Sequence, residues 1–240
     1  MSGDHETAAA KVAAYDWEKI GAELDTFGTA ILPKLLSDSE CHNFATKWHD
    51  SAVFRTTISM ARHGFGRGEY KYYAYPLPAL IAGLRENLYP QLARIANAWS
   101  RRMGSDIRYP PTHDAFLEGC HAAGQLRPTP LLLQYGEGDY NCLHQDLYGD
   151  IAFPLQVAIL LSKPGEDFSG GEFVLTEQRP RMQSRAEVVP LQQGDAVIFA
   201  VNDRPVQGTR GDYRVKMRHG VSRIRSGMRH TLGIIFHDAR

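Results

Sequence analysis

Short apolar segments, separated by turns, fill the second half of this 240-residue chain. Each has about the length of a β-strand and is bounded by glycine, proline or polar residues. A series of short strands joined by turns is the pattern of a β-sandwich or a β-barrel. We predict such strands at Pro130–Tyr135, Leu155–Ser162, Gly171–Leu175 and Pro190–Phe199.

The first half of the chain predicts helices with a few strands between them. The segment Ser37-Asp38-Ser39-Glu40 has the spacing of a capping box, so a helix should begin there and run to about Asp50. A longer helix is expected over Pro78–Arg102, because apolar residues recur every three or four positions; Pro90 should kink or divide it. Further expected elements are strands at Phe27–Leu32 and Phe54–Met60 and a helix at Asp114–Ala123.

The length of the chain suits one large β-rich domain, which we expect to span residues 1–240 in an α+β arrangement. Residues 1–128 should provide mixed helical and strand support together with a candidate lid. Residues 129–240 should form the mainly β core.

The segment His144-Gln145-Asp146 can supply two ligands to one metal ion. In an extended chain, residues two apart point to the same side, so the imidazole and the carboxylate can meet at a single ion. The distal His219 would complete a 2-His-1-carboxylate set, which leaves one face of an octahedron open. Cys142 has the same strand parity as His144 and could approach the metal. The alternative to a metal site at His144-Gln145-Asp146 is a surface turn with a hydrogen-bonded histidine.

From about Pro130 to its end, rather less than half of its length, the chain resembles the jelly-roll (double-stranded β-helix) core of Fe(II)- and 2-oxoglutarate-dependent dioxygenases. Tyr135-x-x-Gly138 leading to His144 is similar to the AlkB DNA-dealkylating branch. The stretches Gly170–Phe173 and Gly194–Phe199, and the ten residues from His219 to Arg229, resemble the prolyl-hydroxylase branch. As a whole, the chain resembles a bacterial family proposed to oxidise damaged or modified nucleic-acid bases.

This resemblance implies a cofactor set and residues to hold it. Fe(II) would be bound by His144, Asp146 and His219, and O2 would take an open metal position. Arg229 would hold the distal carboxylate of 2-oxoglutarate, with help from Tyr135. We expect Arg229 on a strand antiparallel to the one that carries His219; the alternative register turns His230 inward instead. The expected reaction is hydroxylation or oxidative demethylation.

One departure from the AlkB pattern leaves the substrate open. That branch ends in Arg-x-Asn-x-Thr-x-Arg, whereas this chain reads Met228-Arg229-His230-Thr231-Leu232-Gly233-Ile234-Ile235-Phe236. Hydroxylation of a protein, as in prolyl hydroxylases, or of a small molecule is therefore an alternative to base oxidation. A cupin-like metal protein without oxygenase activity and a nucleic-acid-binding module are further alternatives.

A candidate substrate lid lies between residues 62 and 75, where glycines, aromatic residues and cations alternate. Aromatic rings can stack on a base and cations can contact phosphates. The alternative is a β-strand that packs its tyrosines over the mouth of the barrel. The candidate substrate residues are Arg62, Arg67, Tyr70, Lys71 and Tyr73.

Charge is unevenly distributed although the formal net charge is zero. Residues 1–50 hold nine Asp/Glu against four Lys, whereas residues 210–229 hold six Arg and one Lys against one Asp. A basic stretch can mark a face for an anionic partner such as nucleic acid, but a hairpin with solvated arginines has the same composition. With a pI near 7.2, any contact with a polyanion would be local.

The remaining features indicate a cytoplasmic protein. Three cysteines, Cys41, Cys120 and Cys142, form no pair motif, which favours reduced thiols. No apolar run approaches the roughly 18 residues that a membrane span needs. Met1–Tyr15 lacks the basic start of a signal peptide. The oligomeric state has no signal in the sequence.

Overall fold

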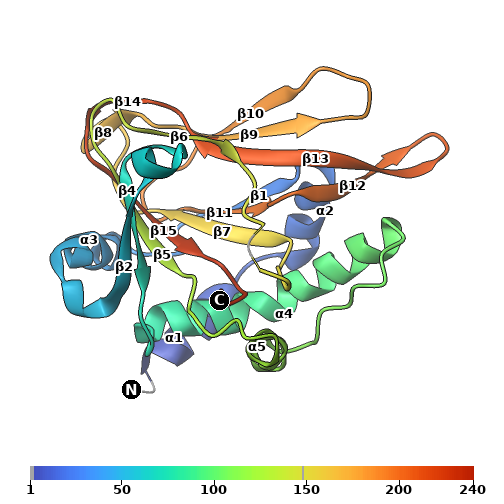
Figure 1. The fold of residues 1–240 in the computed structure, drawn as a ribbon, viewed down its shortest axis with the longest axis horizontal. Helices are drawn as coiled ribbons and strands as arrows, with labels where there is room; N and C mark the ends of the chain where they lie inside the picture. The colour runs from blue at the N-terminus through green and yellow to red at the C-terminus, as the bar shows by residue number, and fades with distance from the viewer. Residues whose placement is uncertain (1–2, 148) are drawn as a thin grey trace.

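Two antiparallel β-sheets dominate the computed structural model, which describes residues 3–147 and 149–240 (Figure 1). The larger sheet runs in the order β1 (Thr29–Leu32), β11 (Ala196–Ala200), β7 (Leu155–Leu160), β15 (Arg229–Ile234), β5 (Leu131–Tyr135), β4 (Glu69–Tyr73) and β2 (Phe54–Ser59). The smaller sheet runs in the order β10 (Arg185–Val189), β9 (Phe173–Gln178), β13 (Gly211–Val221), β6 (Tyr140–His144) and β3 (Gly66–Arg67), and β12 (Asp203–Gly208) pairs with β13. Strands β8 (Phe168–Gly170) and β14 (Ile224–Gly227) form a separate pair.

Helices support the larger sheet from the side away from the smaller one, as Figure 1 shows for α1, α4 and α5. The α-helices are α1 (Gly3–Ala13), α2 (Trp17–Phe27), α3 (Asp38–Thr46), α4 (Ala79–Arg102) and α5 (His113–Ala122), with short 3₁₀ turns at Lys47–His49, Ser51–Val53 and Met60–His63. The expected mainly β fold with helical support is therefore observed. The larger sheet also takes β1, β2 and β4 from the chain before residue 129.

Several local predictions are confirmed. The Ser37 side chain accepts from the Glu40 backbone N–H, and the Glu40 carboxylate accepts from the Ser37 N–H, so the capping box opens α3. The apolar stripe of α4 lies in or against the core, with Leu84, Leu88 and Trp99 fully buried.

The prediction for Pro90 is tested only in part: Pro90 lies inside α4 without dividing it. The strand expected at Pro190–Phe199 is wrong at its start, because the observed strand, β11, begins only at Ala196. The Asp195 carboxylate accepts from the Gln192 N–H and holds the residues before β11 in a turn.

A buried ion pair ties the C-terminal segment to α4. Arg85 donates to Asp238 over 2.7 Å and also to the carbonyl oxygens of Ile235 and Phe236. Tyr75 and His121 complete the hydrogen bonds to the Asp238 carboxylate. These contacts hold the end of the chain that follows β15.

Candidate functional site

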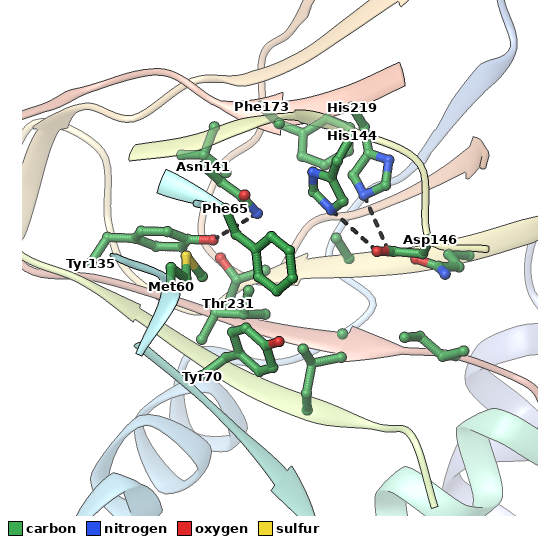
Figure 2. Close-up of a pocket in the computed structure, with 18 of the residues that line it drawn as sticks. Met60, Phe65, Tyr70, Tyr135, Asn141, His144, Asp146, Phe173, His219 and Thr231 are labelled. Carbon is green, nitrogen blue, oxygen red and sulfur yellow. Dashed lines mark hydrogen bonds and ion pairs between the residues drawn. The ribbon is translucent and has the colours of Figure 1, made fainter. Parts of the chain in front are cut away.

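Two histidines and an aspartate meet between the sheets, as Figure 2 shows. His144 ends β6, Asp146 lies two residues after it, and His219 is on β13. The Nε2 atom of His144 is 3.2 Å from one Asp146 oxygen, and the Nε2 atom of His219 is 3.4 Å from the other. One ligand atom from each residue lies within 4.8 Å of the other two, which is the spacing that a shared metal ion requires.

A β-bulge aims these side chains. His144 pairs with His219 and Asn141 pairs with Val221, so β6 has one residue more than β13 over this interval. The extra residue breaks strand alternation, and both Asn141 and His144 line the cavity. Cys142 is left exposed and outside the metal-ligand cluster found among the described residues. Cys142 therefore does not reach the metal-ligand cluster, because the parity argument that made this possible assumed a regular strand.

Hydrogen bonds orient two members of the His144–Asp146 segment. The Nδ1 atom of His144 lies 2.8 Å from the Cys142 carbonyl oxygen, which can only accept. Nδ1 therefore carries a proton, and Nε2 is the atom that faces Asp146 and would ligate a metal. The Gln145 side chain donates to Asn202 and to the Met217 carbonyl oxygen, so the segment after β6 is fixed to the neighbouring strands.

The cluster holds Asp146 in its charged form. Burial alone raises the pKa of Asp146, but hydrogen bonds from His144 and His219 outweigh it and hold this pKa well below its usual range. Burial lowers the pKa of His219. The pKa of His144 is raised, because the Asp146 carboxylate outweighs the burial that lowers it. A charged carboxylate flanked by imidazoles is the donor set of a divalent transition metal.

Arg229 is a buried cation without an acidic partner among the described residues. It is 1% exposed, its guanidinium donates to the Thr231 hydroxyl, and its Nε has no hydrogen-bond partner. Burial lowers the pKa of Arg229 to about 10, and the nearby Tyr135 and Glu172 only partly offset this. A buried charge is normally paired, so the surroundings of Arg229 suit an anion from outside the chain.

Tyr135 lies beside Arg229, directly across the strand pair β5–β15. The guanidinium carbon is 5.8 Å from the centre of the Tyr135 ring. Asn141 donates to the Tyr135 hydroxyl over 3.4 Å, and all three residues line one cavity. The next residue, His230, does not line this cavity and faces Trp48 instead.

The strand that carries Arg229 is not hydrogen-bonded to the one that carries His219. Strand β15 lies in the larger sheet between β5 and β7, whereas β13 lies in the smaller sheet. The chain crosses between the sheets through β14. Arg229 and His219 therefore approach the same cavity from opposite walls.

The cavity between the sheets has an empty volume of about 790 Å³, including the space at its mouth. Its aromatic lining comes from Phe65, Tyr70, Tyr72, Phe173 and Phe199. Figure 2 shows the Phe65 ring pointing into this space, and the residue is 38% exposed, so it stands at the opening.

The structure separates the five candidate substrate residues. Tyr70 lines the cavity, and Arg62 and Arg67 are exposed on the adjoining hairpin. Lys71 faces the opposite side of β4, where it donates to the Trp48 carbonyl oxygen and lies over the Trp48 ring. Tyr73 is buried in the core on that same side.

Strand alternation explains this split, because Tyr70 and Tyr72 share the face that looks into the cavity. The candidate set omitted Tyr72, Phe65, Asn141 and Gln156, which also line the cavity. Because side chains alternate along β4, choosing Tyr70 as a candidate should also have led to Tyr72, two residues further on.

Residues 68–239 match the family Oxygenase-NA, which is described as "Oxygenase, catalysing oxidative methylation of damaged DNA". The chain belongs to this oxygenase family. The matched range contains all three residues of the His-Asp-His cluster and Arg229. Uncharacterized proteins from two strains of Mycobacterium tuberculosis are each 51% identical over 164 residues, which is 68% of this chain and 70% of theirs.

Solved structures of 2OG-Fe(II) oxygenases share the fold of this Oxygenase-NA member. A Trichoplax adhaerens prolyl hydroxylase, solved with a hypoxia inducible factor peptide fragment, has a TM-score of 0.57 at 15% identity and covers 95% of this chain and 91% of its own. A Pseudomonas putida prolyl-4-hydroxylase has a TM-score of 0.54 at 13% identity, over 93% and 100%. A Burkholderia pseudomallei oxidoreductase of the 2OG-Fe(II) oxygenase family has a TM-score of 0.52 at 16% identity, over 94% and 93%.

Among the helices of residues 3–147 and 149–240, none has the length and apolar character needed to cross a membrane.

Proposed function

We propose that this chain is an Fe(II)- and 2-oxoglutarate-dependent dioxygenase that oxidises a modified nucleic-acid base. One observation carries the proposal: a His-Asp-His cluster and a buried arginine without an acidic partner line the same cavity. The cluster offers the donors of a facial triad, and the arginine offers a planar fork for a carboxylate. A dicarboxylate that also binds the metal would use both.

The donor set fits Fe(II). His144 and His219 would each ligate through Nε2, since both Nε2 atoms face Asp146, and Asp146 would ligate as a carboxylate. When bound together with 2-oxoglutarate and O2, Fe(II) supplies an oxidant able to attack a C–H bond. The chain contributes the orientation of these three ligands and a largely apolar wall that limits water.

Arg229 would hold the distal carboxylate of 2-oxoglutarate. The anion would occupy the fork that no described acidic residue pairs, and it would offset the cost of burying the cation. Tyr135, whose hydroxyl accepts from Asn141, can donate its own proton to the same carboxylate. This arrangement would place the dicarboxylate against the larger sheet, with its keto-acid end towards the cluster on the smaller sheet.

We further propose that the two facing sheets form a double-stranded β-helix and that residues 1–240 act as one domain. Strands from both sides of residue 129 complete the larger sheet, and solved oxygenase structures share the fold. A cytoplasmic location is supported by free thiols at all three cysteines.

The substrate class rests on the family and on the cavity lining. The family description names damaged DNA, and aromatic walls suit a flat ring that has left its base stack. Arg62 and Arg67 are exposed beside the opening and form no ion pair with a described residue, so they are free for phosphate contacts. The cavity suits a single flipped or unpaired base better than a duplex.

We propose that the reaction removes a methyl group rather than adding one. Hydroxylation of an N-methyl carbon gives a hemiaminal, which breaks its C–N bond and releases formaldehyde and the N–H base. One O2 and one 2-oxoglutarate are consumed, and succinate and CO2 are formed. This stoichiometry oxidises the methyl carbon and contains no methyl donor.

The test combines a spectrum with product analysis. An anaerobic mixture of the protein, Fe(II) and 2-oxoglutarate should show a visible absorbance band that neither addition gives alone. Asp146→Ala should abolish the band and the succinate product, whereas His42→Ala, which removes an exposed histidine far from the cavity lining, should change neither. A full band and full succinate release in Asp146→Ala would refute the metal site.

Substrate panels then test the base. Single-stranded oligonucleotides with one N-methylated base should stimulate succinate and formaldehyde release. Stimulation by peptides or metabolites alone would keep the oxygenase and replace the nucleic-acid substrate.

A further inference from the structure

Gln156 is a polar residue in a strand that is otherwise apolar and buried. Strand β7 reads Leu155-Gln156-Val157-Ala158-Ile159-Leu160, and all six residues are buried. Gln156 is only 4% exposed, and it lines the cavity between the sheets. A buried amide costs free energy unless its donor and acceptor atoms find partners, so its presence here calls for a reason.

The amide lacks a protein partner. The buried Nε2 atom of Gln156 has no hydrogen-bond partner among the described residues. Turning the amide by half a rotation exchanges its nitrogen and oxygen but still leaves one end unpaired. The side chain therefore presents an unused hydrogen-bonding group to the cavity.

Gln156 lies close to the metal-ligand cluster without belonging to it. It pairs across the strands with Phe199, whose ring centre is 4.5 Å from that of His219. Directly opposed side chains in an antiparallel pair are neighbours, so one ring separates the amide from a metal ligand. Arg229 lies four positions before Gly233 on β15, and Gly233 pairs with Ala158. Gln156 is thus on the same wall as the proposed 2-oxoglutarate anchor but towards its other end.

The larger sheet, which carries Gln156, also gives the cavity aromatic surface for a flat ligand. Gly233 contributes no side chain to this wall, where Leu131 packs closely against it. Tyr70 and Tyr72 add aromatic surface, with ring centres 5.4 Å apart. A planar ring with a polar edge fits these features: the aromatic residues contact its faces, and the amide contacts its edge.

We propose that Gln156 is a specificity-determining residue, whose amide hydrogen-bonds to the polar edge of a methylated nucleobase while the methyl group faces the cluster of His144, Asp146 and His219. This inference rests on the proposed oxygenase function and deepens it. A glutamine amide can donate to a ring carbonyl and accept from an exocyclic amine, so it reads the edge of a base. Gln156 acts on substrate selection, and 2-oxoglutarate binding is independent of it.

The variants Gln156→Leu and Gln156→Glu test this role. Leucine removes the hydrogen bond at similar size, and glutamate replaces the donor by an acceptor. Gln134→Leu is the matched control, because Gln134 pairs with His230 and does not line the cavity. Each protein is assayed for the Fe(II)·2-oxoglutarate band, for its melting temperature, and for succinate release with single-stranded oligonucleotides carrying one N-methylated adenine, cytosine, guanine or thymine.

If Gln156 determines specificity, its variants should change the KM and the base preference without lowering the melting temperature. Gln156→Leu should keep the band and melt no lower than the unaltered protein, since an unpaired buried amide is removed. Its KM for the preferred oligonucleotide should rise about tenfold, and its discrimination among the four bases should weaken. Gln156→Glu should shift preference towards bases with an exocyclic amine, and Gln134→Leu should keep the original KM and ranking.

The outcomes distinguish this inference from the function on which it rests. An unchanged KM and ranking in Gln156→Leu and Gln156→Glu, with the band intact, would overturn the role of Gln156 and leave the oxygenase standing. A band in the unaltered protein without stimulation by any oligonucleotide would overturn the nucleobase class. Absence of the band in the unaltered protein would overturn the oxygenase and this inference together.

Discussion

Replacing Arg229 by methionine tests whether the buried cation is kept for a ligand. The side chain is 1% exposed, donates to the Thr231 hydroxyl and has no acidic partner in the described chain. Methionine fills much of the same space without charge. We expect Arg229→Met to lose affinity for 2-oxoglutarate while the ligand-free protein stays folded and at least as stable as the unaltered one.

The magnitude follows from burial. The pKa of Arg229 falls from its usual range to about 10 because its charged form is desolvated. At 1.36 kcal/mol for each pKa unit, this corresponds to roughly 3 kcal/mol of cost in the ligand-free fold. The unfolded chain holds this proton more tightly, so the cost is present in full at neutral pH. It diminishes only as pH rises above about 10.

The loss of binding is estimated from the missing charged hydrogen bonds. Hydrogen bonds to charged groups contribute about 1.5–3 kcal/mol, so the dissociation constant of 2-oxoglutarate should rise roughly 10- to 150-fold. Arg229→Lys keeps the charge without the planar fork. Its dissociation constant for 2-oxoglutarate should therefore lie between those of the unaltered protein and of Arg229→Met. The assays are an anaerobic titration of the absorbance band and thermal unfolding with and without 2-oxoglutarate.

His230→Ala is the control for Arg229→Met, because His230 is the next residue and faces Trp48 outside the cavity. It should leave the 2-oxoglutarate dissociation constant unchanged. The reasoning fails if Arg229→Met binds 2-oxoglutarate as tightly as the unaltered protein. It also fails if His230→Ala shows the larger loss.

Three further predictions concern the bulge, the buried ion pair and the hairpin. A Cβ at Gly220 would lie 2.6 Å from a carbonyl oxygen of β6, so Gly220→Ala should displace His144 and weaken Fe(II) binding at least tenfold in anaerobic titrations. Burial alone raises the pKa of Asp238, but its ion pair and hydrogen bonds lower it overall. Asp238→Asn should therefore reduce unfolding free energy by about 3–5 kcal/mol at neutral pH, a difference that shrinks as denaturation is measured below pH 4. Charge reversal at Arg62 and Arg67 should raise the KM for oligonucleotides several-fold and flatten its salt dependence in steady-state assays.

Matched variants separate each effect from general damage. Gly119→Ala places a methyl group in open space on α5 and should not weaken Fe(II) binding. Asp150→Asn changes an exposed carboxylate and should leave stability nearly unaltered. Arg101→Glu reverses an exposed charge on α4 and should keep the oligonucleotide KM. Equal effects in a variant and its control would contradict the corresponding prediction.

Local sequence patterns were sufficient for the elements that local interactions decide. The Ser37 capping box needs only four consecutive residues, and the apolar stripe of α4 needs only its 3.6-residue period. The first two members of the His-Asp-His cluster were equally accessible, because His144 and Asp146 are two residues apart. Helix α2, whose Asp16 side chain accepts from two backbone N–H groups, carried a similar N-terminal signal that we did not use.

The facing of individual side chains depended on contacts that sequence spacing does not contain. Alternation in β4 groups Tyr70 with Tyr72 and Lys71 with Tyr73, but it does not say which pair faces the cavity. The packing of Lys71 on Trp48 decides that. The parity argument for Cys142 failed for a related reason, since the bulge depends on how β6 pairs with a strand about 75 residues further along the chain.

Buried polar atoms without partners are informative here only in combination with the cavity. In the described residues such atoms include the hydroxyls of Tyr73 and Tyr89 in the core, which line no part of the cavity, so an unpaired atom alone does not indicate a site. Two others, Nε of Arg229 and Nε2 of Gln156, belong to residues that line the cavity. A folded chain pairs nearly all of its buried polar groups. Two exceptions of different chemistry in the lining of one cavity are therefore best explained by ligands that complete them: a carboxylate at the arginine and a polar ring edge at the glutamine.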